Sequence, residues 1–415
     1  MANLWLIICS LLFLVGPLLR NCTPGKQSSA AGRPQSNQSP SAVLREIPFD
    51  LVSTGHILLE VRVNGKPGWF ILDSANHGIT LDFEFARRAG VEIQQGYIAS
   101  GGGSDSIEAG RASNVAIELS GIVLSNSSVT AIMLKPMEPA LGRSFDGILG
   151  SDLFTRYVVE VDYSNKVIRL YDSATYRSGG KGEVIRLEVD QDSLPFIRVG
   201  VTMPEKQVAE GKFLIDSAAA FVAVLLKSFT ESHNLISPSL RTYEDAGLST
   251  GGGISFLATR AEQVKVGSFA LSNPVILISQ DRKGSMSQRN YDGLIGGDFL
   301  RRFKVVFDYG HQQMVLEPNA SLNDPVDDDC SGLRMRAEGN DFRTIKVTRI
   351  IKNSPAADAK LQRGDILTSI NGQPAGRLTL EKVREMLKDC GKEYELEVAR
   401  GNQLRRVRLG LRPLF

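Results

Sequence analysis

The chain has few of the side chains that bind metals or build disulfide frameworks. Its 415 residues include four histidines and four cysteines, and none of these forms a His-x-x-x-His or Cys-x-x-Cys pair. The usual zinc-ligand patterns are therefore missing, and we predict no metal site. No Gly-Lys-Ser/Thr follows a glycine-rich loop, which argues against a phosphate-binding loop, and we predict no cofactor. A formal net charge of +2 gives no electrostatic reason to expect a nucleic acid partner.

Charged side chains are also missing from the first 19 residues. Residues 4–19 form an apolar run that contains Pro17 and is followed by Arg20. Such a run is short for a membrane span and is typical of the apolar core of a secretory signal. We predict that residues 1–22 are a signal peptide or an N-terminal anchor. The protein is then exported to the periplasm or cell envelope, or secreted, and membrane attachment through residues 4–19 stays open. Residues 23–44, rich in Ser, Gly, Pro, Gln and Asn, predict a disordered leader.

Two stretches further along the chain have the same form. They are "WFILDSAN" at 69–76 and "KFLIDSAA" at 212–219, and each places an aspartate, Asp73 or Asp216, at the end of an apolar run. Such a run is typical of a buried strand. Ionised carboxylates are seldom buried without a partner, because desolvation raises their free energy steeply. Each aspartate therefore needs a partner.

Further segments repeat in the same order at nearly the same spacing. The two aspartates are 216 − 73 = 143 residues apart, and "FDGILGSDLF" precedes "YDGLIGGDFL" by 291 − 145 = 146. Two glycine-rich stretches (99–110 and 249–259) and two alternating strands ("HILLEVRV" and "PFIRVGV") also correspond. Since a fixed spacing across several segments indicates an internal repeat, we predict a duplicated β-rich unit from about residue 45 to residue 320.

Two carboxyl groups from two similar halves can act together. Side by side they share a proton, because like charges about 3 Å apart cannot both stay ionised. One carboxylate then takes a proton from a water molecule, while the other, protonated, donates a hydrogen bond to the substrate carbonyl. In this hypothesis Asp73 and Asp216 are the catalytic pair, Ser74 and Ser217 form hydrogen bonds across the interface, and backbone N–H groups hold the carboxylates.

The repeated pattern resembles the signature of pepsin- and retropepsin-like aspartic proteases. The residues that carry the resemblance are "FILDSAN" with "GILG" and "FLIDSAA" with "GLIG". The resemblance implies a mainly β, bilobal fold of pepsin/retropepsin-like β-barrel lobes at 45–180 and 181–320, with peptides or proteins as substrates. It also implies flap hairpins with tips at Gly102 and Gly252. Hairpins that are merely mobile are the alternative.

The chain departs from this family at one position in each lobe. Family members carry glycine after the Ser or Thr, where this chain has Ala75 and Ala218. Alanine keeps the backbone N–H, but it adds a Cβ that we expect to face the cleft, and it excludes dihedrals that only glycine reaches readily. Two alternatives to an active endopeptidase therefore stay open: a catalytically inactive peptide-binding protein that keeps the cleft, and a structural envelope scaffold.

The last part of the chain resembles a PDZ domain of the kind attached to bacterial envelope proteases. Residues 321–329, polar and acidic, predict a linker, and the resemblance covers 330–415 through "SGLRM" and "SPAADAKLQRGDILTSINGQ". It implies a small β-barrel with helices, which adds a bound peptide or C-terminus as a strand beside a helix at about 380–388, capped by Thr379. A unit that only packs on the protease is the alternative. The implied peptide-binding residues are Gly332, Leu333, Arg334, Met335 and Val383.

Two further expectations follow from these resemblances. In a PDZ fold Cys330 and Cys390 lie close together, and export would permit a disulfide between them; two free thiols are the alternative. The catalytic unit is expected to end near Asn323. Other polar residues near the motifs are not expected to be catalytic. Asp146 and Asp292, Asp162 and Asp308, and Asp365 are given structural roles, and Ser104 and Ser106 lack the sequence-adjacent base that a serine nucleophile needs.

Overall fold

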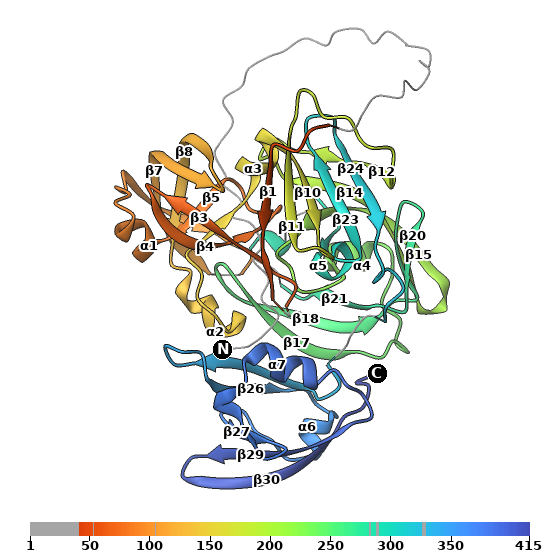
Figure 1. Cartoon of the computed structure of the whole chain (residues 1–415). Helices are drawn as coiled ribbons and strands as arrows, with labels where there is room; N and C mark the ends of the chain where they lie inside the picture. The colour runs from red at the N-terminus through yellow and green to blue at the C-terminus, as the bar shows by residue number, and fades with distance from the viewer. Residues whose placement is uncertain (1–40, 53, 104, 282–283, 288–289, 326–328) are drawn as a thin grey trace.

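Strands make up about half of the described chain, and its helices are short. The computed structural model describes residues 41–415, apart from 53, 104, 282–283, 288–289 and 326–328. The strands form four sheets (Figure 1). One belongs to each lobe of a bilobal body, one is shared between the lobes, and one belongs to a C-terminal PDZ unit. The predicted fold class, mainly β and bilobal with a C-terminal PDZ unit, is confirmed. The predicted signal or anchor lies outside the described residues.

The first lobe is built on an eight-stranded sheet in the order β2-β3-β4-β9-β5-β8-β7-β6. Asp73 directly follows β4 in this sheet, and β9 lies between β4 and β5, parallel to β4 and antiparallel to β5. The strands are β2 (Asp50–Leu51), β3 (Ile57–Val63), β4 (Lys66–Leu72), β5 (Ile79–Asp82), β6 (Gln95–Ser100), β7 (Ser106–Leu119), β8 (Ile122–Ile132) and β9 (Gly147–Leu149).

The second lobe has a ten-stranded sheet in the order β17-β18-β21-β16-β22-β15-β14-β19-β20, with β13 paired to β14. Asp216 is the last residue of β15, which runs parallel to β22. The strands are β13 (Glu188–Val189), β14 (Pro195–Met203), β15 (Gln207–Asp216), β16 (Ala223–Leu225), β17 (Tyr243–Ser249), β18 (Gly252–Arg260), β19 (Gln263–Val266), β20 (Phe269–Ser272), β21 (Val275–Ser279) and β22 (Gly293–Gly296).

The strands around the aspartates follow corresponding orders in the two lobes. The order β4-β9-β5-β8-β7-β6 of the first lobe matches β15-β22-β16-β21-β18-β17 of the second. The two apolar-Gly segments of the repeat form β9 and β22, directly beside the strands that carry the aspartates. A Cβ at Gly147 or Gly293 would lie 2.3 or 2.4 Å from a ring carbon of Phe70 or Phe213. Glycine at these positions therefore lets β9 lie this close to β4, and β22 this close to β15.

A six-stranded sheet joins the lobes, a feature that the sequence did not predict. Its order is β1-β11-β10-β23-β24-β12, so that β10 of the first lobe pairs with β23 of the second. The N–H of Leu44 donates to the Leu170 carbonyl at 2.9 Å, directly before the first residue of β1. The strands are β1 (Arg45–Pro48), β10 (Tyr157–Asp162), β11 (Val167–Asp172), β12 (Glu183–Arg186), β23 (Phe303–Asp308) and β24 (Gln313–Pro318).

Short helices close the ends of these sheets. None of the helices in the described part of the chain is long and apolar enough to cross a membrane. The helices of the two lobes are α1 (Phe83–Arg88), α2 (Glu138–Leu141), α3 (Ser151–Arg156), α4 (Lys227–Ser232) and α5 (Gly297–Leu300). Single 3-10 turns occupy Lys135–Met137, Pro204–Lys206, Ser285–Ser287 and Ala375–Arg377.

The C-terminal unit has its own sheet, in the order β25-β26-β27-β29-β30, and its own apolar core. A disulfide joins Cys330 to Cys390, as predicted. Thr379 caps α7, as predicted, because its hydroxyl accepts a hydrogen bond from the N–H of Lys382 at 3.1 Å. The helix ends at Met386, two residues earlier than expected. The elements are β25 (Leu333–Glu338), β26 (Thr344–Ile350), α6 (Pro355–Asp358), β27 (Ile366–Ile370), β28 (Gln373–Pro374), α7 (Leu380–Met386), β29 (Glu393–Arg400) and β30 (Gln403–Gly410).

Candidate active site

Asp73 and Asp216 occupy equivalent positions in the two lobes. Neither residue has any exposed surface. The backbone N–H of Asp73 donates to the carbonyl of Leu149 in β9 at 3.0 Å. In each lobe the carboxylate accepts a hydrogen bond from the backbone N–H two residues further along the chain. The N–H of Ala75 donates to Asp73 at 2.8 Å, and the N–H of Ala218 donates to Asp216 at 3.0 Å. Each carboxyl group is thus held by the turn that follows its strand.

Ser74 and Ser217 bond to each other's backbone across the interface of the lobes. The N–H of Ser74 donates to the hydroxyl of Ser217 at 2.9 Å, and the N–H of Ser217 donates to the hydroxyl of Ser74 at 3.1 Å. Each hydroxyl then donates to a carbonyl of the opposite lobe, Ser74 to Ile215 at 2.7 Å and Ser217 to Leu72 at 3.2 Å. These four bonds join the two turns directly beside the aspartates.

The Ser74–Ser217 bonds bring Asp73 and Asp216 close together, so the charge of one acts on the other. Burial is the largest cause that raises the pKa of Asp73 well above its ordinary value, and the negative charge of Asp216 is the second. The N–H groups of Ala75 and Asn76 lower the pKa, but they do not outweigh these two effects. The Oδ2 atom of Asp73 accepts no hydrogen bond from the described residues. A carboxyl group in this setting keeps its proton more readily than an exposed one.

The two alanines do not line an open cleft, which corrects the expectation for their Cβ atoms. Ala75 is fully buried in an apolar cluster whose other buried members lie between residues 194 and 294, in the second lobe. Ala218 is buried in a cluster whose other buried members lie between residues 52 and 148, in the first lobe. Neither alanine has a positive φ, so neither position requires glycine.

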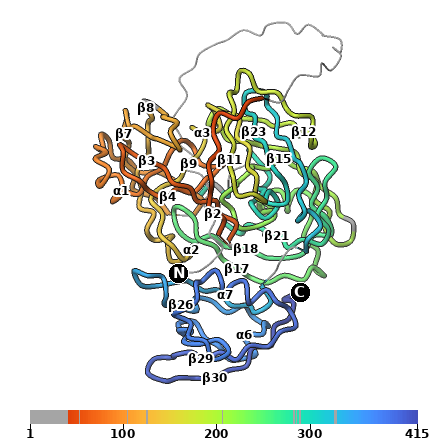
Figure 2. The backbone as a smooth tube through the Cα atoms, viewed as in Figure 1, coloured from red at the N-terminus to blue at the C-terminus, as the bar shows by residue number. Residues whose placement is uncertain are grey.

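Two hairpins meet at their tips. The first consists of β6 and β7 and contains Gly102 in its tip; the second consists of β17 and β18, with Thr250 and Gly251 at the turn just before Gly252. The N–H of Gly103 donates to the Thr250 carbonyl at 2.9 Å, and the N–H of Asp105 donates to the Gly251 carbonyl at 2.8 Å. Figure 2 lets the reader follow the β17–β18 hairpin, which lies between the lobes and the blue C-terminal unit.

The other polar residues that the sequence singled out make local contacts. Asp146 accepts the N–H of Trp69 and Asp292 the N–H of Lys212, at 3.0 and 2.8 Å. Ser104 lies outside the described residues, and Ser106 begins β7. The remaining carboxylates also accept backbone N–H groups: Asp162 from Asn165, Asp308 from His311, and Asp365 from Gln362, with Asp365 also paired to Arg400. No group of three or more potential metal ligands occurs in the described part of the chain.

The residues implied to bind a peptide in the PDZ unit lie together at β25, but several already have partners. The N–H of Gly332 donates to Asp329 at 3.0 Å, and that of Leu333 to the hydroxyl of Ser331 at 2.9 Å. Arg334 is paired with Asp245 of β17 at 2.7 Å. Met335 and Val383 are buried in the core of the unit. The sequence did not identify Asp245 as a partner, because no pattern links β17 to a segment about 90 residues away.

Comparisons with known proteins agree with both parts of this architecture. Residues 59–153 match a family model described as aspartyl protease, and residues 346–400 match one described as PDZ domain. Among solved structures, the chain is similar to the crystal structure of basic 7S globulin from soybean. That similarity has 10% sequence identity and a TM-score of 0.41 over 67% of this chain and 95% of that chain. No curated protein matches the chain. One segment of the first lobe is thus similar to aspartyl proteases, and one segment of the C-terminal unit is similar to PDZ domains.

Proposed function

We propose that the protein is an aspartic endopeptidase that hydrolyses peptide bonds with a water molecule activated between Asp73 and Asp216. One observation carries the proposal: the exchange of hydrogen bonds between Ser74 and Ser217 joins two buried aspartates from two lobes at one point. Two carboxyl groups placed together in this way share a proton, and one then acts as an acid while the other acts as a base.

We propose that the two aspartates share one proton, because burial and the charge of Asp216 raise the pKa of Asp73 and two adjacent carboxylates cannot both stay ionised. The ionised member of the pair takes a proton from the water molecule, whose oxygen bonds to the substrate carbonyl carbon. The protonated member gives its proton to the carbonyl oxygen, which yields a tetrahedral diol. A proton next passes to the amide nitrogen, the C–N bond breaks, and the products are a carboxylic acid and an amine. No covalent bond to the protein forms.

The matching strand orders of the lobes support the further proposal that residues 45–320 arose by duplication. Export is a separate proposal. It is supported by the apolar run at residues 4–19 and by the Cys330–Cys390 disulfide, since disulfides are typical of oxidising compartments. Periplasm, cell envelope and secretion all fit these two observations.

Cleavage of a mixed library of quenched fluorescent peptides tests the proposed activity. Asp73→Asn and Asp216→Asn should each lower the initial rate about 10³-fold or more, and the double variant should be no worse, because the two residues act as a unit. Asp146→Asn is the matched control, since its amide oxygen can still accept the Trp69 N–H. Wild-type rates in either single variant would refute the catalytic pair. Peptide binding without any cleavage by the natural chain would favour the inactive peptide-binding protein.

A further inference from the structure

The PDZ unit contacts three consecutive residues of β17 in the second hairpin. The ring of Tyr243 lies 4.9 Å, centroid to centroid, from that of Phe415. The carboxylate of Glu244 lies 4.0 and 3.9 Å from two cationic side chains of the PDZ unit. Asp245, the third residue, pairs with Arg334. Because β17 is a terminal strand that pairs with β18 alone among the described strands, these contacts give it a second attachment.

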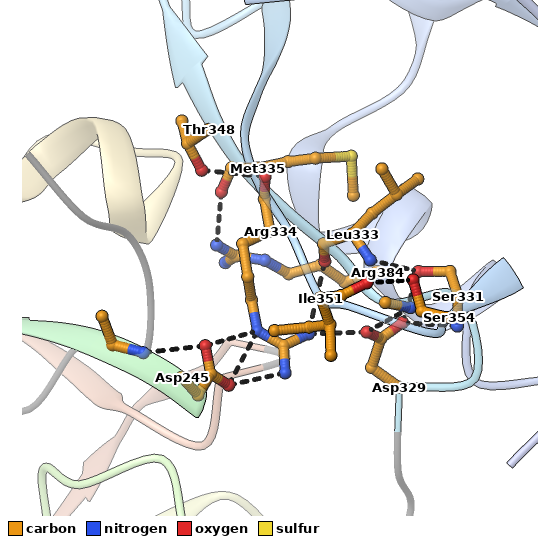
Figure 3. A network of polar contacts seen from close by, with 12 residues as sticks. Asp245, Asp329, Ser331, Leu333, Arg334, Met335, Thr348, Ile351, Ser354 and Arg384 are labelled. Carbon is orange, nitrogen blue, oxygen red and sulfur yellow. Dashed lines mark hydrogen bonds and ion pairs between the residues drawn. The ribbon is translucent and has the colours of Figure 1, made fainter. Parts of the chain in front are cut away.

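Arg334 lies between two carboxylates (Figure 3). Its Nε atom donates to Asp245 at 3.1 Å and its Nη2 atom at 2.7 Å, while its Nη1 atom donates to Asp329 at 2.5 Å. The side chain of Asp245 is fully buried, and that of Arg334 is 6% exposed. Burial alone would lower the pKa of Arg334, but the charges of Asp245 and Asp329 raise it well above its usual value. The guanidinium is therefore charged, and salt screens its bonds only weakly because they are buried.

The charges at this contact are balanced within the chain. A second arginine, Arg384 of α7, lies near the first: burial and then the charge of Arg334 lower its pKa to about 10, while Glu381 and Asp329 act to raise it. Two guanidinium groups are thus accompanied by three carboxylates, those of Asp245, Asp329 and Glu381. Because two nitrogens of Arg334 donate to the carboxylate of Asp245, this pair also fixes the orientation of β17 on the PDZ unit.

The first lobe contacts the same part of the PDZ unit. Its α2 lies against β25, the terminal strand of the PDZ sheet, as the reader can follow in Figure 1. A Cβ at Gly142, which follows the last residue of α2, would lie 3.2 Å from the Cβ of Leu380 in α7. Within the PDZ unit, Arg384 of α7 donates to the Met335 carbonyl of β25 at 3.1 Å and so joins these two elements. The first lobe is therefore packed on β25 and α7, while the second lobe is paired with Arg334 of the same β25.

We propose that the PDZ unit is a brace between the two lobes, and that Arg334 is a positioning residue that holds the base of the second hairpin while the tip of this hairpin contacts the first. A movement of one lobe relative to the other must then separate the PDZ unit from α2 or from β17. A hairpin held at its base and at its tip is already ordered when a substrate arrives, which lowers the cost of binding. The effect on cleavage rests on the proposed function, whereas the effect on the hairpin does not.

Hydrogen–deuterium exchange of the full-length protein measures how firmly the hairpin is held. The double variant Asp245→Asn/Arg334→Gln removes both charges of the pair together, since a single change would leave one buried charge without its partner. Asp329 keeps the N–H groups of Ser331 and Gly332 as donors. Exchange of backbone N–H groups in residues 243–254 should become about tenfold faster, because local opening controls exchange. Exchange in β10 and β23, which join the lobes, should stay as in the wild type.

Arg406→Gln is the matched control, because it also removes an arginine from an ion pair of the PDZ unit. Arg406 pairs with Glu397 at 3.0 Å, but it lies in β30, at the opposite end of the sheet from β25, and its side chain is 74% exposed. An exposed pair of this kind contributes little to stability. Exchange in residues 243–254 should therefore stay as in the wild type.

A second pair of variants tests whether the brace reaches the first lobe. Gly142 and Gly65 both have a positive φ, of 83° and 78°, which asparagine adopts more readily than most other residues with a side chain. A Cβ at Gly142 meets Leu380, whereas one at Gly65 has no described neighbour within 4 Å. Gly142→Asn should therefore push the PDZ unit away from α2 and speed exchange in residues 243–254 about threefold, although these residues belong to the other lobe. Gly65→Asn should leave this exchange unchanged.

Cleavage kinetics with a quenched fluorescent peptide separate positioning from a loss of fold. A hairpin that is no longer held must be ordered when the substrate binds, and this cost weakens binding. The double variant should therefore raise KM about fivefold and keep kcat within about twofold of the wild type. A variant that is merely unfolded in part would lower kcat instead, because fewer molecules would be active.

Three results would overturn the brace: wild-type exchange in residues 243–254 of the double variant, exchange that rises equally in β10 and β23, or the same exchange in Gly142→Asn as in Gly65→Asn. A lower kcat at an unchanged KM would overturn the positioning role of Arg334. Exchange requires no catalysis, so it remains readable if the protein cleaves nothing. A protein that cleaves peptides but shows no exchange response keeps the proposed function and loses the brace. The reverse pattern keeps the brace and loses the endopeptidase.

Discussion

At the level of single residues, the raised pKa of Asp73 links the stability of the protein to pH. This pKa is raised well above the ordinary value by burial and by Asp216, so the folded protein holds this proton more tightly than the unfolded chain, where the pKa is about 3.9. The resulting stabilisation is fully present below the unfolded pKa and is lost as the pH rises through the folded pKa. Most carboxyl groups in folded proteins have a lowered pKa, so their contribution to stability changes with pH in the opposite direction. The pH dependence expected for Asp73 can therefore be tested.

Asp73→Asn removes the titration while it keeps the shape of the side chain. At about pH 3 the wild type and the variant should melt at the same temperature, because Asp73 is then protonated in both the folded and the unfolded wild-type chain. At pH 7 the variant should melt at least about 2–4 °C higher, the shift expected for about 1 kcal/mol in a chain of this size class. Differential scanning calorimetry across this pH range measures both. A difference that does not depend on pH would contradict the raised pKa.

The buried alanines beside the aspartates allow a second prediction at this scale. Because Ala75 and Ala218 are packed in apolar clusters and have no positive φ, glycine should gain nothing in backbone freedom. Each Ala→Gly change should destabilise by about 1–2 kcal/mol, the sum of about 0.4–1 kcal/mol of unfolded-state entropy and about 0.8 kcal/mol for one buried methyl group. Urea unfolding measures this cost. If the double glycine variant instead gains activity that the natural chain lacks, the methyl groups have silenced the enzyme.

At the level of elements, contact between the two hairpin tips depends on glycine. A Cβ at Gly103 would lie 2.2 Å from the carbonyl oxygen of Gly251, whereas one at Gly253 would lie 3.8 Å from its nearest neighbour, the Gly247 carbonyl. Gly103→Ala should therefore separate the tips and lower kcat/KM by about tenfold, because hairpin closure completes a site that excludes water. Gly253→Ala is the matched control and should stay near wild type. Equal kcat/KM for both variants would show that tip contact plays no part in turnover.

The strands nearest the aspartates could be predicted from the sequence, whereas the contacts between distant elements could not. Apolar runs that end in Asp73 and Asp216 indicate buried strands, and the spacing of the repeat pairs them. The β10–β23 pairing and the Arg334–Asp245 pair join segments whose local sequences contain no sign of each other. Arg334 did stand out, as one of the residues that the PDZ resemblance implies for peptide binding. Its partner depends on how two folded units dock, which no local pattern records.

At the level of the whole molecule, a buried arginine determines where the catalytic unit ends. Arg302 is 2% exposed, and its guanidinium donates to four carbonyls of the segment after β24: those of Ser321, Leu322, Asp324 and Pro325. Part of the predicted linker is thus packed on the second lobe. An end near Asn323, as the sequence suggested, would remove two of these acceptors. Among the described residues the last of these acceptors is Pro325, so the second lobe extends at least to this residue.

A chain shortened to end at Pro325 should therefore fold and cleave unstructured peptides, since both aspartates, both serines and both hairpin tips precede this point. Without the PDZ unit the second hairpin loses its attachments at Tyr243, Glu244 and Asp245, and residues 243–254 should exchange faster than in the full chain. A chain that ends at Ser321 is the matched control. It lacks three of the four carbonyls after β24 that accept from Arg302, and it should be about 1–3 kcal/mol less stable than the chain that ends at Pro325, because buried donors lose partners. Thermal melts rank the two chains, and quenched peptides report their activity. The chain that ends at Pro325 could instead be folded and soluble but cut nothing that the full chain cuts. The PDZ unit would then be part of the catalytic machinery, because its contacts with β17 would be needed to hold the hairpin in the position for cleavage.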